Sequence, residues 1–402
     1  MIKTMIKTQT LKGFRDFLPA EVKKRQYVIN TLKKVFESYG FEPLETPALE
    51  YEEILLGKYG EEDDKLMYRF EDNGKRRVAL RYDQTVPLAR VVAQYQNELP
   101  IPFKRYQIQN VWRAENTQKG RYRELLQCDI DTVGASSPLA DAEIIEVADK
   151  SLRMLGFRKY KIKVNDRKIF ENIDLESIKI LDKLEKIGPE KVEEELARIN
   201  SKETLNKIEN SKPLETTDAI LKMLKNLGIN ENNYEFSPTL ARGLDYYTGT
   251  IFEIKIEGYS GGSVGGGGRY DNLIGLFANR QIPAVGFAFG FDRLMEAMEE
   301  QNLFPANLNT TKVLVTVFSP ELLDNSIRVC EILSQNNINQ ELYVDPNAKM
   351  EKQLKYADKK QIPYVVIIGP DEAKNNTVTV KNLKTREQKA LPFDQFLDLF
   401  KE

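Results

Sequence analysis

A predicted strand over residues 122–133 carries polar side chains at every second position. At the two-residue period of a strand, Gln127, Asp129 and Asp131 share one face, and the residues between them on the other face are Leu, Cys and Ile. The polar face offers hydrogen-bond acceptors to an amine or another N–H group. A half-solvated edge strand would show the same alternation, so this segment alone leaves both interpretations open.

Basic side chains concentrate in residues 104–123, which hold six Lys or Arg against one acidic residue, Glu115. Arg113 falls on a predicted strand, where a fixed guanidinium can stabilise the charge of a transferring phosphoryl group. The loop 116–120 and Arg121 would present more positive charge to a polyanion, and a solvated basic hairpin is the alternative. The whole chain has 59 basic and 61 acidic residues, so any nucleic-acid surface must be local.

Two adjacent tyrosines follow an Arg and an Asp in residues 240–250, where Arg242, Asp245, Tyr246 and Tyr247 stand close to two glycines. This is an unusual mixture for a hydrophobic core. Phenol hydroxyls can donate to or accept from a polar aromatic ring. A turn followed by an edge strand with aromatic packing is the alternative.

Seven glycines lie between residues 258 and 268, and such a tract lets a backbone approach a ligand closely. Neither the spacing of a Rossmann dinucleotide site nor that of a P-loop occurs there. A flexible hairpin is a fair alternative. An alternating Gly/aromatic strand over 286–291 follows, and it would bring Arg293 to a strand-to-helix junction that faces a cleft.

The chain contains no histidine, which excludes Ser-His-Asp triads, histidine general bases and histidine-ligated metals. The two cysteines, Cys128 and Cys330, cannot form a four-cysteine zinc site, and so few suggest a reducing compartment. No apolar run reaches the roughly 18 residues that span a bilayer, and residues 1–8 lack the apolar centre of a signal peptide. We therefore expect no membrane association and a cytoplasmic location.

The hydrophobic periodicity predicts an α+β scaffold for these residues. Amphipathic helices are expected over 20–39, 141–155 and 292–302. Strands that are broken by helices without strict βαβ alternation favour an antiparallel sheet. The predicted strands are 66–70, 77–82, 103–113, 122–133, 246–256 and 284–291.

Changes in composition divide the chain. We expect a core from residues 1–165 and 233–304, because residues 166–232 are rich in Lys, Glu, Ile and Leu and indicate a helical insertion. A linker over 305–311 precedes residues 312–402, whose alternating strands and helices predict an α/β domain.

Several segments resemble the motifs of class II aminoacyl-tRNA synthetases and, among them, the histidyl-tRNA synthetase family. Those similar to the general class II motifs 1, 2 and 3 are the helix 20–39 with the strand ending at Pro47, Val111–Glu115, and Gly286–Arg293. Those similar to the histidyl family are Gly13–Asp16, Arg81–Thr85, Leu240–Thr250 and Gly265–Asp271. The resemblance spans the chain. It implies an antiparallel-sheet class II catalytic core with a helical insertion and a C-terminal α/β anticodon-binding domain.

The resemblance also implies roles for matching residues. The ammonium group of L-histidine would be held by Asp83, Thr85 and Gln127, and its imidazole read by Asp131 with Tyr246 or Tyr247. The catalytic arginines at the α-phosphate would be Arg113 and Arg242, and ATP would be bound by Arg113, Glu115, Arg121 and Arg293. No metal is expected on protein side chains, since Mg²⁺ would accompany the phosphates of ATP. Asn116 departs from the family, in which many members carry a basic residue in this tRNA-contacting loop.

The implied reaction joins L-histidine to ATP, giving histidyl-adenylate, and then transfers the histidyl group to tRNA(His). The attacking carboxylate has a pKa near roughly 3.5, so the first step needs positioning and positive charge but no general base. For the second step our hypothesis is that an adenylate phosphate oxygen accepts the ribose proton. Residues 349–389 carry ten basic and five acidic residues, which suits an anticodon stem. The family implies a homodimer.

Two other classes of protein fit part of the pattern. A non-catalytic synthetase paralogue that regulates ATP phosphoribosyltransferase would share the core fold, but it is expected to lose catalytic arginines and the anticodon domain. A general single-stranded RNA-binding protein would not need the Tyr246-Tyr247 signature. Because Arg113, Arg242 and residues 312–402 are all present, the sequence favours the enzyme.

Overall fold

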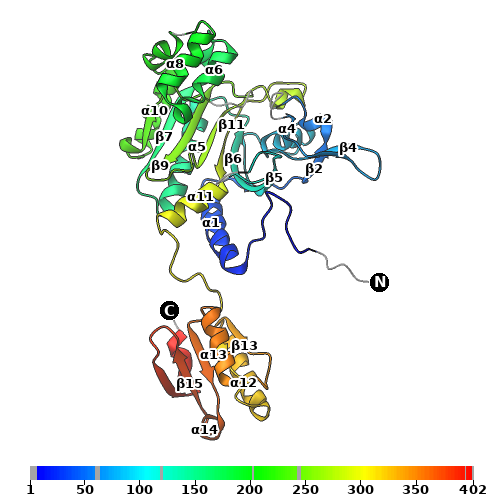
Figure 1. The fold of residues 1–402 in the computed structure, drawn as a ribbon, viewed down its shortest axis with the longest axis vertical. Helices are drawn as coiled ribbons and strands as arrows, with labels where there is room; N and C mark the ends of the chain where they lie inside the picture. The colour runs from blue at the N-terminus through cyan, green and yellow to red at the C-terminus, as the bar shows by residue number, and fades with distance from the viewer. Residues whose placement is uncertain are drawn as a thin grey trace. The chain divides into compact units, whose positions relative to one another are not determined.

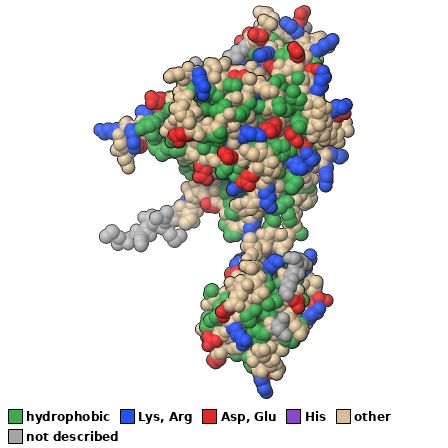
Figure 2. Space-filling model, turned by 180° about the vertical axis from the view of Figure 1, so that it is seen from behind, with side chains coloured by type: hydrophobic (Ala, Val, Ile, Leu, Met, Phe, Trp, Pro, Cys, Tyr) green, Lys and Arg blue, Asp and Glu red, His purple; other side chains and the backbone are tan. Residues whose placement is uncertain are grey.

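The structure of the chain, a computed structural model, describes residues 7–58, 64–117, 121–201, 203–241, 246–393 and 395–400. The chain divides into two compact units, Met1–Phe304 and Pro305–Glu402 (Figure 1). None of the described helices is both long and apolar enough to cross a membrane. Charged side chains of both signs are interspersed over the larger unit on the face seen in Figure 2.

The larger unit is built on an eight-stranded sheet with the order β1-β5-β6-β11-β10-β9-β7-β8. The five central pairings, from β5–β6 to β9–β7, are antiparallel, and only the edge pairings β1–β5 and β7–β8 are parallel. This confirms the predicted antiparallel α+β core. The strands are β1 (Glu42–Pro43), β5 (Phe103–Trp112), β6 (Glu124–Val133), β7 (Tyr160–Asp166), β8 (Tyr234–Phe236), β9 (Thr250–Ile256), β10 (Gly265–Arg269) and β11 (Ala284–Gly290).

Helices cover one face of this sheet and form the main hydrophobic core with it. The apolar positions of β6, Cys128 and Ile130, are fully buried there, together with Phe287 and Phe289 of β11. The opposite face is left for the polar residues of the same strands. The covering helices are α1 (Pro19–Ser38), α5 (Pro138–Met154), α10 (Glu215–Asn226) and α11 (Phe291–Glu300).

A second, smaller core borders the polar face of the sheet. It contains α4 (Thr85–Gln94), which begins two residues after Asp83 and was not expected from the sequence. Pro87 and several β-branched residues lower the helix propensity of this segment, but burial of its apolar side chains outweighs that preference. The same region holds α2 (Glu52–Leu55) and a sheet of β2 (Leu49–Tyr51), β4 (Arg77–Leu80) and β3 (Arg69–Glu71).

Short helices follow β7 and pack next to the polar face. Their apolar residues form a cluster that includes Leu240, Tyr247 and Ile251, so this helical segment lies against the start of β9. The helical character that the composition of residues 166–232 predicted is confirmed here. The helices are α6 (Leu175–Leu181), α7 (Leu184–Ile187), α8 (Pro189–Arg198) and α9 (Thr204–Glu209).

The last four glycines of the tract form strand β10 inside the sheet, and the earlier ones lie in the turn that joins β9 to β10. A side chain has no room there. A Cβ on Gly267 would lie 2.0 Å from the carbonyl oxygen of Gly286, and a Cβ on Gly268 would lie 2.6 Å from that of Thr250. The glycines therefore allow the strands to pack closely and leave both faces of β10 without side chains at these positions. After the tract the chain forms a 3-10 turn, Ile274–Leu276.

The smaller unit has a five-stranded sheet with the order β13-β12-β14-β15-β16. The first three strands are parallel and the last two pairings are antiparallel, which confirms the predicted α/β domain. Helix α14 and strand β16 add to the alternation of helices and strands, and the unit ends in a 3-10 turn at Phe396–Phe400. The elements are β12 (Val313–Val315), α12 (Leu323–Gln335), β13 (Gln340–Leu342), α13 (Met350–Lys359), β14 (Tyr364–Ile367), α14 (Pro370–Asn375), β15 (Thr377–Asn382) and β16 (Gln388–Pro392).

Candidate active site

A cavity of about 1450 Å³ lies on the polar face of the eight-stranded sheet. Strand β6, the loop before α4, the segment before β9 and the start of α11 all contribute to its wall. Arg242, which is also a predicted site residue, lies outside the described residues. The other predicted site residues all line the cavity, and they are Asp83, Thr85, Arg113, Glu115, Arg121, Gln127, Asp131, Tyr246, Tyr247 and Arg293.

Asp131 stands on the floor of the cavity between two neighbouring strands. Its Cα partners are Arg105 on β5 and Gly286 on β11. A Cβ on Gly286 would lie 1.9 Å from Oδ1 of Asp131, so only glycine leaves space for this carboxyl group. The Gly/aromatic alternation of β11 therefore has a physical reason on each face: the aromatic rings fill the core, and the small residues clear the site.

Both oxygens of Asp131 are bound by side chains that the sequence analysis gave no role. Nη2 of Arg105 lies 2.7 Å from Oδ2, and the hydroxyl of Tyr270 donates to Oδ1. Burial raises the pKa of Asp131, while Arg105 and the Tyr270 hydrogen bond act against that rise. Because each carboxylate oxygen can accept more than one hydrogen bond, Asp131 still offers an acceptor to the cavity.

Tyrosine residues surround this carboxyl group. The hydroxyl that meets Asp131 is that of Tyr270, while Tyr246 and Tyr247, which are predicted to read the imidazole together with Asp131, also line the cavity. The Tyr246 ring lies 5.0 Å from the Tyr247 ring and 6.0 Å from the Tyr270 ring. Burial raises the pKa of Tyr246, as do Tyr247 and Asp83, while a hydrogen bond with Thr85 lowers it. The Arg-Tyr-Asp that ends the glycine tract was the available signal for Tyr270.

The predicted ammonium site sits at the beginning of α4. Oδ1 of Asp83 accepts a hydrogen bond from the backbone N–H of Val86 at 3.1 Å, which fixes the carboxyl group against the first turn of the helix. Asp83 is buried, and Thr85 is the first residue of the helix. Both side chains thus project from a rigid element into the cavity.

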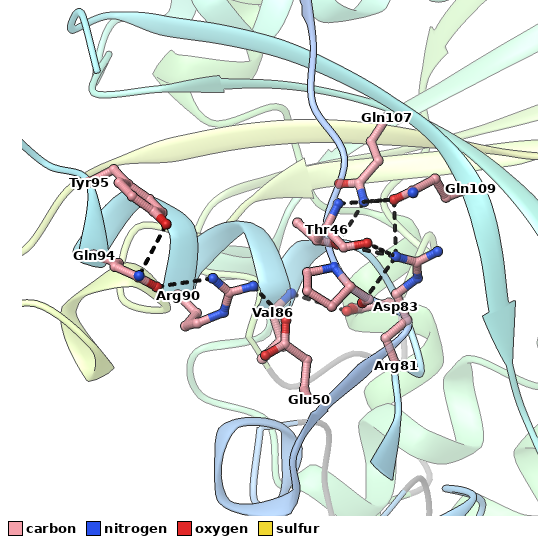
Figure 3. A network of polar contacts seen from close by, with 11 residues as sticks. Thr46, Glu50, Arg81, Asp83, Val86, Arg90, Gln94, Tyr95, Gln107 and Gln109 are labelled. Atoms are coloured by element: carbon pink, nitrogen blue, oxygen red, sulfur yellow. Dashed lines mark hydrogen bonds and ion pairs between the residues drawn. The ribbon is translucent and has the colours of Figure 1, made fainter. Parts of the chain in front are cut away.

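A buried network holds the chain just before Asp83 (Figure 3). Arg81 is 3% exposed, and its Nη1 donates to the carbonyl oxygen of Thr46 at 2.6 Å and to Oε1 of Gln109 at 3.0 Å. Its Nε donates to the carbonyl oxygen of Asn110 at 2.8 Å. One guanidinium therefore joins the segment after β1, strand β5 and the loop that carries Asp83.

The predicted ATP end of the cavity presents half-buried arginines. Nε of Arg113 donates to the carbonyl oxygen of Tyr82 at 3.1 Å, and its guanidinium lies 4.5 Å from the Tyr82 ring centre. Nη1 of Arg293 donates to the carbonyl oxygen of Ser263 at 2.9 Å. Nη1 of Arg121 lies 3.7 Å from Oε2 of Glu115. Burial lowers the pKa of Arg293, and the neighbouring charge of Arg121 lowers it further.

An N-terminal segment braces this end. Arg15 and Arg25 both pair with Oδ1 of Asp292, at 2.9 and 3.2 Å, next to Arg293 at the start of α11. The Arg15 guanidinium also lies 3.2 Å from the ring centre of Tyr122. The Gly13–Asp16 segment, which the sequence connected to the family only by resemblance, therefore packs between the beginnings of α11 and β6.

The geometry joins two chemistries in one cavity. Buried carboxyl and hydroxyl groups at one end suit a small ligand with N–H groups, and guanidinium groups at the other suit phosphates. An antiparallel sheet with this Arg-bearing strand pair and Gly/Arg strand-helix junction is the catalytic core of a class II aminoacyl-tRNA synthetase.

Comparison with known proteins narrows that class. A profile described as "Histidyl-tRNA synthetase" matches residues 13–187 and 172–294, and one described as "Anticodon binding domain" matches residues 312–402. The chain belongs to the histidyl-tRNA synthetase family.

Relatives match along almost the whole chain. A histidine–tRNA ligase of Cytophaga hutchinsonii is 39% identical, with 97% of this chain and 99% of the relative covered. One of Clostridium tetani is 37% identical over the full length of both chains. The crystal structure of histidyl-tRNA synthetase from Nostoc sp. PCC 7120 is 30% identical and has a TM-score of 0.83, covering 97% of this chain and 98% of the other.

Proposed function

We propose that this chain performs both steps of histidine–tRNA ligation in the cavity of its larger unit. The activity follows from the family, and the observation that carries its assignment to this cavity is the pairing of buried acceptors with half-buried arginines in a single space. The arrangement supports L-histidine at the Asp83 and Asp131 end. It supports ATP at the Arg113 and Arg293 end.

In the first step, the carboxylate of histidine attacks the α-phosphorus of ATP, the new bond forms an acyl phosphate, and pyrophosphate leaves. Arg113, held against Tyr82, would stabilise the negative charge that grows on the α-phosphate. Arg242 is assigned the same role by its motif. Asp83, Thr85 and Gln127 would hold the ammonium group so that the carboxylate points at the phosphorus.

Mg²⁺ enters this proposal as part of the substrate MgATP. The described residues contain no cluster of three acidic or cysteine side chains that could hold a metal ion. Two acidic side chains at the phosphate end, Glu115 and Asp292, already pair with arginines. The ion would therefore be bound mainly by the β- and γ-phosphates.

In the second step, a terminal ribose hydroxyl of tRNA(His) attacks the acyl carbon, and AMP leaves. The hydroxyl proton would pass to a phosphate oxygen of the adenylate. The chain has no histidine to take this proton, and Asp131 is a poorer acceptor because it is tied to Arg105 and Tyr270. A carboxyl variant that blocks transfer from preformed adenylate, yet leaves adenylation intact, would overturn this step.

The remaining parts of the proposal concern assembly and partners. Residues 1–165 and 233–304 would form the catalytic domain, and residues 166–232 an insertion beside it. Residues 312–402, which match an anticodon-binding domain, would bind the anticodon stem through the basic segment 349–389. We expect a homodimer through the motif 1 segment, which light scattering would detect, and a cytoplasmic place of action.

Histidine-dependent exchange of pyrophosphate with ATP tests the function. We expect exchange with L-histidine and not with other amino acids, followed by histidylation of tRNA(His). A regulatory paralogue or a general RNA-binding protein would give no exchange. That result would contradict the proposal even if the protein bound RNA.

A further inference from the structure

Asp129 is a buried carboxyl group in the cavity to which neither the motifs nor the comparisons give a role. It lies on β6 between Gln127 and Asp131, on the same face, and lines the cavity. Its side chain is 3% exposed, and its Oδ1 has no hydrogen-bond partner in the part of the chain that the structure describes. Buried polar atoms in proteins nearly always have a partner, so this oxygen points to a ligand that donates a hydrogen bond.

The neighbours of Asp129 explain why no group among the described residues bonds that oxygen. Its cross-strand partner Gln107 uses its amide N–H groups on Oγ1 of Thr46 at 2.9 Å and on Oε1 of Gln109 at 2.6 Å. Its partner on the other side, Ala288, has no side-chain donor. The nearby guanidinium of Arg105 bonds Oδ2 of Asp131 instead.

We propose that Asp129 accepts a hydrogen bond from a protonated nitrogen of the substrate histidine and is a further specificity-determining residue. This inference rests on the proposed function, in which Gln127 holds the ammonium group and Asp131 the imidazole. Gln127 and Asp131 are four residues apart on one strand, about 13 Å between their Cα atoms, and Asp129 lies midway, so a ligand held by both side chains passes over Asp129. Histidine carries N–H donors at both ends, whereas an apolar amino acid of similar size lacks the ring donor.

One structural account competes with this one. Asp129 could serve only as a counter-charge for Arg105. Burial raises the pKa of Asp129, and the positive charges of Arg105 and Arg113 lower it. The two accounts differ in their effect on the ligand-free protein. A carboxylate kept for a substrate destabilises the empty fold because it is buried and unpaired, whereas a structural counter-charge stabilises it.

The test uses Asp129→Asn in the full-length protein, with Thr132→Val as the matched control. Thr132 is on the same strand and equally buried, and its hydroxyl also lacks a partner among the described residues, but it lies on the opposite face. In pyrophosphate exchange we expect Asp129→Asn to raise the KM for histidine about tenfold and leave the KM for ATP unchanged. The melting temperature without ligand should rise, and the further rise caused by histidine should shrink. Thr132→Val should leave both KM values unchanged.

Competition by imidazole identifies the donor nitrogen. If the inhibition constant of imidazole is larger for Asp129→Asn than for the unmodified protein, the hydrogen bond goes to the ring. If it is unchanged, the hydrogen bond goes to the ammonium group. Both results agree with the proposal. An unchanged histidine KM contradicts it, and so does a lower melting temperature with both KM values raised together. If the unmodified protein shows no histidine-dependent exchange, the proposed function itself fails. The melting temperature of ligand-free Asp129→Asn then still decides whether Asp129 is a counter-charge.

Discussion

The two ends of the cavity hold their charged side chains in different ways. At the end proposed to bind histidine (the histidine end), Arg105 is fully buried, Asp131 is 2% exposed, and their charged atoms are 2.7 Å apart. At the end proposed to bind ATP (the ATP end), the Arg121 side chain is 40% exposed, and its acidic partner Glu115 is 3.7 Å away. The charged groups of the histidine end are therefore paired before a ligand binds. The ATP end keeps positive charge that the phosphates of a ligand would neutralise.

The largest effect should come from breaking the buried pair at the histidine end. Arg105→Met leaves Asp131, which is 2% exposed, without its counter-charge, and this should lower the free energy of unfolding by about 3–5 kcal/mol. Urea denaturation measures this. The double variant Arg105→Met with Asp131→Asn should recover part of the loss. If the single variant lowers the free energy of unfolding by less than about 1 kcal/mol, the pair contributes little to the stability of the fold.

Removing positive charge at the ATP end should lower the rate of pyrophosphate exchange and leave the free energy of unfolding nearly unchanged. We expect Arg113→Gln to lower the kcat of pyrophosphate exchange by about 10²–10³, because a donor aimed at developing charge is lost. The free energy of unfolding should change little, since Arg113 is half-buried and bonded to one carbonyl group. Arg121→Gln is the matched control and should cost less, because this side chain is more exposed. Equal losses in the two variants would contradict the assignment.

The support beneath the ammonium site should produce a moderate effect. Arg81→Lys keeps the positive charge but lacks the planar fork that bonds Thr46, Gln109 and Asn110 together. The loop with Asp83 should then lose its position, and the KM for histidine should rise about tenfold while the KM for ATP stays constant. Arg90→Lys, which changes the Arg90–Glu50 pair of the same region, is the control. If both substrates lose affinity equally, Arg81 supports the whole fold and not the loop.

The smallest effect should be a pH dependence at the histidine end. Burial, together with Asp131 and Asp83, raises the pKa of Asp129, while Arg105 and Arg113 oppose that rise. The folded chain thus binds this proton more tightly than the unfolded chain, so the group's contribution to stability is lost as pH rises from about 4 through the raised pKa. The melting-temperature advantage of Asp129→Asn should grow with pH. An advantage that is equal at pH 5.5 and pH 8 would contradict this.

The sequence predicted the active strand well because alternation is a local property. The period of β6 placed Gln127 and Asp131 on one face, and the structure has them there. The gathering of residues from separate segments in one cavity came from motif resemblance, since no spacing rule joins them. Their roles in catalysis and binding stay predictions.

The sequence could not reveal features that depend on tertiary pairing. Arg105 appeared as one more basic residue of a charged segment, and only the register of β5 against β6 sets it opposite Asp131. Arg81 looked like part of a motif, yet its partners are 28 to 35 residues away along the chain. The strand β10 was ambiguous because its need for glycine comes from backbone atoms of other strands.

The most direct test of a cavity with two separate ends is a pair of titrations in pyrophosphate exchange. Histidine and MgATP are varied in turn for Asp131→Asn and for Arg293→Gln. We predict that Asp131→Asn raises the KM for histidine at least tenfold with less effect on ATP, and that Arg293→Gln raises the KM for ATP with less effect on histidine. If either variant shifts both KM values by the same factor, or if the histidine KM of Asp131→Asn is unchanged, this division of the cavity is wrong.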